Sequence, residues 1–511
     1  MTTRKRGSSF LFPVVFVVPL LHCGGTSSSL TPPSGSPSAD EGVVPDAPLL
    51  HDLGVVSSGD AAGDASVITT PSIAWVGVNS TVQLIPDLSD PASCPSGWTR
   101  LFEQLVGEGE KRERLIPIQP AYVDTFGDIF AFSRDLAASG RLLREEVPTS
   151  RFSLSWPCVM GNERIREEFV DAVWYAQDPD ARGKGLDGGF ALELTLSHRD
   201  SYPAALSDNP TFGLLGGWAH PQARESFVTY VQLVLDEIGP ALPAGSVLYI
   251  ANEPTVDLFD GYLSPEGRFP PGGTGAGRSL AAALVNQRDA FMDAGWRIRS
   301  AGFTPAIAIN VRPMTVGADL PGASLLEQLY NWWLADALAT GCIDNDFDGA
   351  CENVILPDDP AVRQLGITFY GTMAATAETV EFGLPGEVEQ PLARRVLDFT
   401  SSGEHFRSAM VAVRDRYADR VASGTLTIGV AEIGLSSGAP SDQLGWLEDY
   451  LAVAEEFELP FMGIHSIFEH AEFTSGEWFF HLIDQCDGAC ELTEWGSTFL
   501  ETLRAHRTRE E

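Results

Sequence analysis

The chain alternates short apolar runs with longer stretches in which apolar residues recur at helical spacing. The longer stretches are typical of amphipathic helices. Residues 223–239 place several large apolar side chains on one helical face: Phe227, Tyr230, Val231, Val234 and Leu235. The short runs have the length and composition of fully buried parallel strands. They are Ile73–Val78, Arg151–Trp156, Ala191–Leu196, Val247–Ile250, Ala306–Ile309, Leu365–Phe369, Leu426–Val430 and Phe461–Ile464.

This alternation predicts an α/β fold, a (β/α)8 TIM barrel that occupies residues 73–511 as a single domain. A doubly wound open sheet is the alternative. It would normally show a glycine-rich turn after its first strand, and no such turn follows Ile73–Val78. In a barrel, the carboxyl ends of the strands meet at one rim, so polar residues at those ends are the first candidates for chemistry.

Polar side chains do follow several of the predicted strands. Each one alone could cap a helix or be a satisfied structural group, but their convergence on one rim favours a site. Glycosidic bonds are cleaved between two carboxyl groups, and Glu253 and Glu432 fit that requirement. The polar residues are Ser197, His198, Arg199 and Asp200 after the third strand, Asn252 and Glu253 after the fourth, Tyr370 after the sixth, Glu432 after the seventh, and Glu469, His470 and Glu472 after the eighth.

The N-terminus has the pattern of an export signal. Arg4, Lys5 and Arg6 precede an apolar stretch over residues 10–21, which predicts a signal peptide over residues 1–22. The sequence Leu-Leu-His-Cys ending at Cys23 resembles a bacterial lipoprotein box and predicts a lipid on Cys23. A plain secretory signal cut nearby is the alternative. Either interpretation predicts an extracytoplasmic protein of the bacterial cell envelope.

Residues 23–72 are rich in Ser, Gly, Pro and Asp and have no apolar periodicity, so we expect a disordered tether. The formal net charge of the whole chain is −37, which argues against nucleic acid or an anionic lipid surface as a partner. Contact with a membrane is therefore expected only through the N-terminal lipid. Nothing in the sequence indicates an oligomeric state.

Six cysteines follow Cys23, an even number that favours disulfides in an exported protein. Proximity suggests the pairs Cys342–Cys351 and Cys486–Cys490. Cys94 and Cys158 then remain to pair with each other, since both would follow early strands on the same rim. Free buried thiols are the alternative.

Two other motifs suggest different chemistry. Residues 434–438 match the G-x-S-x-G pattern of serine hydrolases around Ser436, with Asp449 and His465 later in the chain. Ala439 and Pro440 interrupt before the next helix, whereas a hydrolase elbow enters its helix at once, so we do not favour an esterase.

The second motif consists of Asp344, Asp346 and Asp348 before a glycine, which is the beginning of a calcium-binding loop. Ile355 occupies the position where a complete EF-hand has glutamate, so a solvated acidic turn is the alternative. We expect no cofactor for catalysis and keep calcium as a structural ion.

Read along the chain, several segments resemble glycoside hydrolase family 1, the β-glucosidase family, in the family's order over nearly the whole domain. They are WVGVNSTVQL, RFSLSW, LTLSHRDSYPAAL, GGW, IANEPTV, GYLSPEGRFPPG, GITFYGT and EHAEFTSG. The resemblance implies a retaining exo-β-glycosidase acting on β-glucoside- or β-galactoside-like substrates. Two other functions stay open: a carbohydrate-binding lipoprotein with impaired catalysis, and an endo-acting glycanase of the same clan.

The resemblance also implies residue roles. Glu432 would be the nucleophile, Glu253 the acid/base, Asn252 the ligand of the 2-hydroxyl, and Tyr370 the residue that orients the nucleophile. Other sugar contacts would come from Gln83, His198, Glu472, His465 and Phe473. The chain departs from the family at His465 and Phe473, where tryptophans are usual, and at Arg199, Thr368, Ala431 and Ile433. Loss of a stacking indole weakens apolar contact with a sugar ring.

Overall fold

The computed structural model of the protein describes residues 73–79, 94–106, 129–143, 145–160, 164–177, 191–198, 202–265, 267, 269–355, 359–399, 402–434, 440–467, 481–483, 486 and 490–510. The chain divides into two compact units, 1–67 and 68–511, and every described residue belongs to the second. The predicted signal peptide, Cys23 and the tether lie outside the described residues. Within the described part, no helix is long and apolar enough to cross a membrane.

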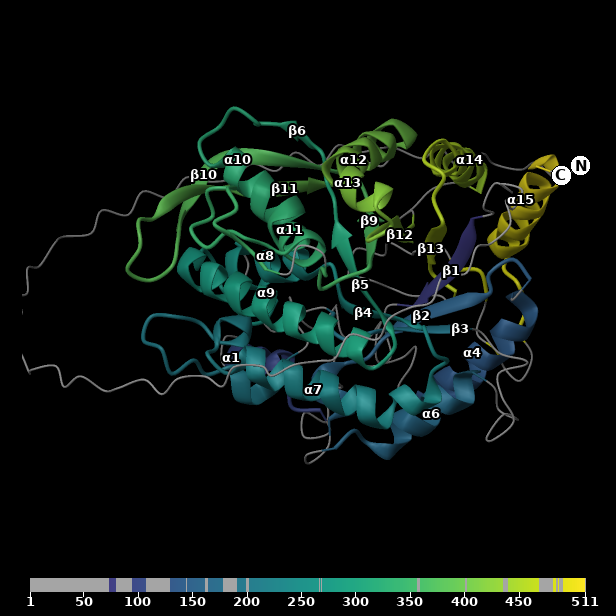
Figure 1. Ribbon diagram of the computed structural model, residues 1–511, viewed down its shortest axis with the longest axis horizontal. Helices are drawn as coiled ribbons and strands as arrows, with labels where there is room; N and C mark the ends of the chain where they lie inside the picture. Colours follow the sequence, from purple (N-terminus) through teal and green to yellow (C-terminus); the bar gives the residue numbers. More distant parts are fainter. Residues whose placement is uncertain are drawn as a thin grey trace, which may run out of the picture. The chain divides into compact units, whose positions relative to one another are not determined.

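Eight parallel strands form a closed barrel in the order β1-β13-β12-β9-β5-β4-β3-β2 (Figure 1). This closure confirms the predicted TIM barrel and excludes the open doubly wound sheet. The strands are β1 (Ala74–Asn79), β2 (Thr149–Ser153), β3 (Ala191–Thr195), β4 (Val247–Asn252), β5 (Thr304–Asn310), β9 (Gln364–Phe369), β12 (Thr427–Ile433) and β13 (Phe461–His465).

Helices follow the strands and cover the barrel from outside, with α7 and α9 side by side (Figure 1). The five apolar residues predicted on one face of α7 are all buried. The helices are α1 (Gly97–Val106), α4 (Ile129–Leu143), α5 (Trp156–Val159), α6 (Glu167–Gln177), α7 (Ala223–Glu237), α8 (Pro254–Leu263), α9 (Gly277–Ser300), α10 (Ala323–Glu327), α11 (Trp333–Thr340), α12 (Gly403–Arg416), α13 (Ala418–Ala422), α14 (Pro440–Glu456) and α15 (Glu494–Glu510). A π-helical turn, Gln328–Trp332, joins α10 to α11.

The predicted second strand, Arg151–Trp156, lies too late in the chain. The strand ends at Ser153, and Trp156 begins the short helix α5. The apolar run continues past the strand because α5 is also buried. Trp156 packs there against Trp218, Phe227 and Tyr230, with ring centroids 5.2–5.8 Å apart.

Two small sheets lie outside the barrel sheet. Strand β6 (Met314–Val316) follows β5, and β10 (Thr372–Phe382) follows β9 and pairs antiparallel with β11 (Gln390–Asp398). The second sheet pairs β7 (Cys342–Ile343) with β8 (Asn353–Val354). The apolar runs of the sequence do not predict these sheets.

The structure contains the disulfides Cys94–Cys158, Cys342–Cys351 and Cys486–Cys490, the three pairs suggested by the sequence. The first joins α5 to the residues just before α1, so it connects the segments that follow β1 and β2 in the chain.

Candidate active site

Glu253 lies between strand β4 and helix α8 in a backbone conformation that is rare for a residue with a side chain. Its φ and ψ are 47° and 42°, the left-handed region, and Pro254 begins the helix immediately afterwards. Such a conformation costs about 1–3 kcal/mol and persists only where the surroundings impose it. Here the Glu253 N–H donates to the Ala308 carbonyl of β5, at 2.9 Å. The strained turn fixes a buried carboxyl group at the end of β4.

Neutral donors hold that carboxyl group. The Thr368 hydroxyl donates to Glu253 Oε1 at 2.6 Å, and Asn310 Nδ2 donates to the same oxygen. Arg312 Nε in turn donates to Asn310 Oδ1 at 2.7 Å, which fixes the orientation of the amide. Both bonds reach Oε1, so Oε2 has no hydrogen-bond partner in the described part of the chain.

A cation and a phenol hold Glu432 on β12. Tyr370 donates its hydroxyl to Glu432 Oε1 at 2.5 Å, and Arg151 Nη2 donates to Oε2 at 3.1 Å. The same nitrogen of Arg151 also donates to the Ala431 carbonyl at 3.1 Å. The Arg151 and Glu432 side chains are only 2% and 7% exposed. This buried ion pair stabilises the charged form of Glu432.

Strand pairing brings the two carboxyl groups to one rim. Thr368 of β9 is the register partner of Glu432 on one side and of Asn310 on the other. The Thr368 hydroxyl also donates to Glu253. Thr368 therefore lies next to both glutamates. Its backbone pairs with the strand that carries Glu432, and its side chain donates to Glu253.

A third carboxyl group, Glu193, lies inside the barrel beside Arg151, its register partner on β2. Burial raises the pKa of Glu193 to about 7, although the positive charge of Arg151 lowers it. The Arg151 guanidinium lies 4.5 Å from the ring centroid of Tyr249, whose hydroxyl accepts a bond from Gln364 at 2.8 Å. Burial also raises the pKa of Tyr249, and the charge of Glu193 raises it further.

Asn252 belongs to a hydrogen-bonded chain that crosses three strands. Its Nδ2 lies 3.1 Å from His198 Nε2, and His198 Nδ1 lies 3.0 Å from the Ser153 hydroxyl. Because an amide nitrogen can only donate, His198 Nε2 accepts and Nδ1 carries the proton. Asn252 Oδ1 is buried without a hydrogen-bond partner among the described residues, so it can accept a bond from a ligand.

Among the other predicted residues, His465 ends β13 and is fully buried. The following lie outside the described residues: Gln83, Arg199, Asp200, Ser436, Glu469, His470, Glu472 and Phe473. Asp449 is exposed on α14, against Gly403 of α12. An exposed Asp449 and a fully buried His465 do not suit the esterase alternative.

The predicted metal residues lie between β7 and β8, away from the two glutamates in the chain. Ligand oxygens of Asp344, Asp346 and Asp348 lie within 4.8 Å of one another. Burial raises the pKa of Asp344, and hydrogen bonds from the backbone N–H groups of Gly349 and Phe347 lower it.

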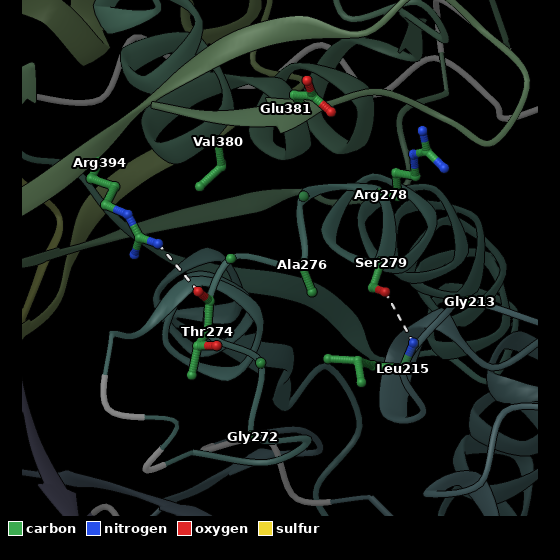
Figure 2. Close-up of a pocket in the computed structure, with 13 residues that line it drawn as sticks. Gly213, Leu215, Gly272, Thr274, Ala276, Arg278, Ser279, Val380, Glu381 and Arg394 are labelled. Carbon is green, nitrogen blue, oxygen red and sulfur yellow. Dashed lines mark hydrogen bonds between the residues drawn. The ribbon is translucent and has the colours of Figure 1, made fainter. Parts of the chain in front are cut away.

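A pocket of about 650 Å³ lies between the first turn of α9, the glycine-rich residues 272–277 and the β10–β11 hairpin (Figure 2). Arg394 Nη2 donates to the Thr274 carbonyl at 3.2 Å, and the Leu215 N–H donates to Ser279 Oγ at 3.0 Å. A second pocket, of about 290 Å³, lies between α8 and the hairpin, where Arg395 pairs with Asp260 at 2.7 Å. Neither Glu253 nor Glu432 lines these pockets.

Sequence reasoning missed three residues of the site. Arg151 and Glu193 lie within predicted strands and were not site candidates, and neither was Asn310. For Arg151 and Glu193 the available signal was a charged residue within an otherwise apolar run, because a charge is rarely buried without a partner or a function. Asn310 directly follows the predicted strand Ala306–Ile309, so its signal was the strand-end position itself.

No protein-family model matches the sequence, and no curated protein matches it. Solved structures do match. They include the AHE enzyme from Alicyclobacillus herbarius (18% identity, 85% of this chain and 98% of that one, TM-score 0.60). The GH1 β-glucosidase from Exiguobacterium antarcticum B7 matches at 16% identity, over 86% and 98% of the two chains, with a TM-score of 0.59. A Thermotoga maritima β-glucosidase in complex with deoxynojirimycin matches at 15% identity, over 85% and 98%, with a TM-score of 0.59. The protein therefore has a (β/α)8 barrel fold like that of the family 1 β-glucosidases.

Proposed function

We propose that the protein is a retaining exo-β-glycosidase that uses Glu432 as nucleophile and Glu253 as acid/base. The observation that carries this proposal is the unequal environment of two buried carboxyl groups on one rim. Glu432 is paired with the Arg151 cation, which favours the ionised form that a nucleophile needs. Glu253 receives neutral donors on Oε1, which leaves Oε2 to carry a proton.

The reaction would proceed in two displacements. Glu432 attacks the anomeric carbon while the glycosidic bond breaks and Glu253 gives its proton to the leaving oxygen. Glu253 then removes a proton from water, which attacks the glycosyl-enzyme and releases Glu432. Retention needs carboxyl groups about 5–5.5 Å apart. Thr368 donates to Glu253 and is the register partner of Glu432, an arrangement in keeping with such a short separation.

We propose that the sugar is a β-linked glucoside or galactoside bound at its non-reducing end. Asn252 Oδ1 would accept a bond from the 2-hydroxyl, because it is buried and no described residue donates to it. His198 would fix the Asn252 amide, and the resemblance to family 1 implies that its ring also lies against a neighbouring hydroxyl of the sugar. Gln83, Glu472, His465 and Phe473 would complete the sugar site, as the resemblance to family 1 implies.

Hydrolysis of a panel of aryl β-glycosides tests this function. The Glu432→Ala variant should lose activity by about 10⁴-fold or more, and azide should restore part of it by forming a glycosyl azide. Glu448→Ala, an exposed glutamate on α14, is the matched control and should keep wild-type rates. A wild-type protein that binds these sugars without cleaving them would instead support the non-catalytic alternative. A strong preference for polymers would support an endo-acting glycanase.

We also propose that the protein is exported and held at the cell envelope by a lipid on Cys23. This rests on the basic and apolar pattern of residues 4–21. Cys23→Ser should move the protein from the membrane fraction to the soluble extracytoplasmic fraction. Unchanged membrane association would contradict lipidation at this cysteine.

A further inference from the structure

The loop between β7 and β8 gathers three aspartates at one point. The ligand oxygens of Asp344, Asp346 and Asp348 lie within 4.8 Å of one another. No arginine, lysine or histidine of the described residues forms an ion pair with any of the three. Three carboxylates at this spacing repel one another unless a cation lies between them.

Asp344 gives a second, independent indication of a ligand. The residue is only 5% exposed, and one carboxylate oxygen, Oδ2, accepts the Gly349 N–H at 3.0 Å. The other oxygen, Oδ1, is buried and has no hydrogen-bond partner among the described residues. A buried carboxylate oxygen without a partner is costly, and a bound cation would remove that cost.

The ligand type suits calcium, because all three side chains offer carboxylate oxygens, which hard cations prefer. Calcium–oxygen bonds are about 2.3–2.6 Å long, so oxygens bound to one ion can lie up to about 5 Å apart, and the three aspartates meet this limit. Calcium takes about six to eight oxygen ligands, so backbone carbonyls and water would supply those that the three aspartates do not.

Neighbouring residues fix the loop from outside without occupying its carboxylates. Trp333 Nε1 donates to the Asp344 carbonyl at 3.0 Å, and Arg288 Nη1 donates to Asn345 Oδ1 at 3.1 Å. Phe347 is buried between Trp333 and Phe382, with ring centroids 5.2 and 4.9 Å away. The backbone of the loop is therefore supported by α9, α11 and β10, while Asp346 and Asp348 remain exposed to solvent.

We propose that Asp344, Asp346 and Asp348 bind one calcium ion that secures the β7–β8 loop against the β10–β11 hairpin. The loop already contacts the hairpin through Gln390, whose Nε2 donates to the Asp346 carbonyl at 3.4 Å. Ile355 supplies no carboxylate at the last position of the loop. The affinity is therefore that of extracellular calcium modules, about 10⁻⁴–10⁻³ M.

Terbium luminescence and calorimetry on the full chain test this site without any enzyme assay. Trp333 contacts the Asp344 carbonyl, so light absorbed by this indole should sensitise a terbium ion in the loop, and calcium should displace it. The variant Asp346→Asn/Asp348→Asn removes two exposed ligands and no buried group, so its melting temperature in chelator should match the wild type. The control, Asp208→Asn/Asp319→Asn, makes the same charge change at aspartates elsewhere.

The wild type and the control should bind about one calcium per chain, and millimolar calcium should raise their melting temperatures by about 2–5 °C over the chelated protein. The Asp346→Asn/Asp348→Asn variant should lose at least tenfold in affinity and most of the thermal shift. Saturable binding that is equal in this variant and in the wild type would overturn the proposal. So would the absence of saturable binding in the wild type up to about 10 mM calcium, well above the affinity range of such modules.

Discussion

The wild-type protein should lose stability as the pH rises from about 4.5 to about 7, because buried Glu193 resists ionisation. The Glu193→Gln variant should not show this loss. Glu193 is 9% exposed inside the barrel, and one of its oxygens has no hydrogen-bond partner among the described residues. Burial raises its pKa from 4.5 to about 7, against the opposing charge of Arg151. Glutamine keeps the size of the side chain and cannot ionise.

The sign and size of the effect follow from proton linkage. Because the folded-state pKa of Glu193 lies above its unfolded value, its contribution to stability is fully present below pH 4.5 and is lost as the pH rises through 7. A pKa difference of one between the folded and unfolded states corresponds to about 1.36 kcal/mol. A rise from 4.5 to about 7 therefore corresponds to a loss of about 3 kcal/mol. Above pH 7 the loss is complete and the difference becomes constant.

Urea unfolding followed by circular dichroism at unit steps from pH 4 to pH 8 measures this effect. The free energy of unfolding of Glu193→Gln minus that of the wild type should rise by about 3 kcal/mol across the range, because all other titrations cancel in the difference. Glu448→Gln, on the exposed surface of α14, should give a flat difference. A difference for Glu193→Gln that is also flat to within about 0.5 kcal/mol would refute the reasoning, since no group with so raised a pKa could then be present.

Three further predictions concern the contacts of the site and the disulfides. Arg151→Met should lower the free energy of unfolding at pH 7, measured by urea unfolding, by about 3–5 kcal/mol, because it leaves Glu432 buried without its cation. The control Arg100→Met, at an exposed ion pair, should change the free energy of unfolding little. Thr368→Val should lower kcat about tenfold by removing one hydrogen bond to Glu253. In steady-state kinetics the loss should be larger for poor leaving groups; equal loss for all would contradict a role in proton transfer. Replacing both cysteines of the Cys94–Cys158 disulfide with alanine should lower the free energy of unfolding by about 4 kcal/mol, against about 2 kcal/mol for the same change at Cys486–Cys490. The difference arises because the first disulfide closes a loop with a sequence separation of 64 and the second one of 4. Equal melting temperatures of the two variants would contradict this ranking.

The barrel could be predicted because its strands are buried on both faces and are therefore continuous apolar runs. The second strand was misplaced for the same reason, since Trp156 extends the run into a buried helix. Pro157, in the first turn of that helix, was the available signal for a helix start. The β10–β11 hairpin was missed because its alternation is weak and its residues are only partly buried.

Residues at strand ends could be predicted as site candidates because parallel strands all present their carboxyl ends at one rim. Charged residues within strands were harder to assign to the site, since an inward charge has no periodicity of its own and is marked only by the apolar run around it. Thr368 stood out in the sequence only as a departure from the family 1 pattern, and its bond to Glu253 became visible once β9 and β4 had positions in space.

The pairing of Arg151 with Glu432 shows why the electrostatics of the site needed coordinates. The two residues are 281 positions apart, and their strands, β2 and β12, are separated in the barrel by β1 and β13. Their contact is therefore no consequence of strand pairing, which joins only neighbours. It exists because the sheet closes, so that side chains from non-adjacent strands meet in the interior. An open sheet with the same strands would leave Arg151 and Glu432 without each other, and their buried ion pair is in this sense a product of barrel closure.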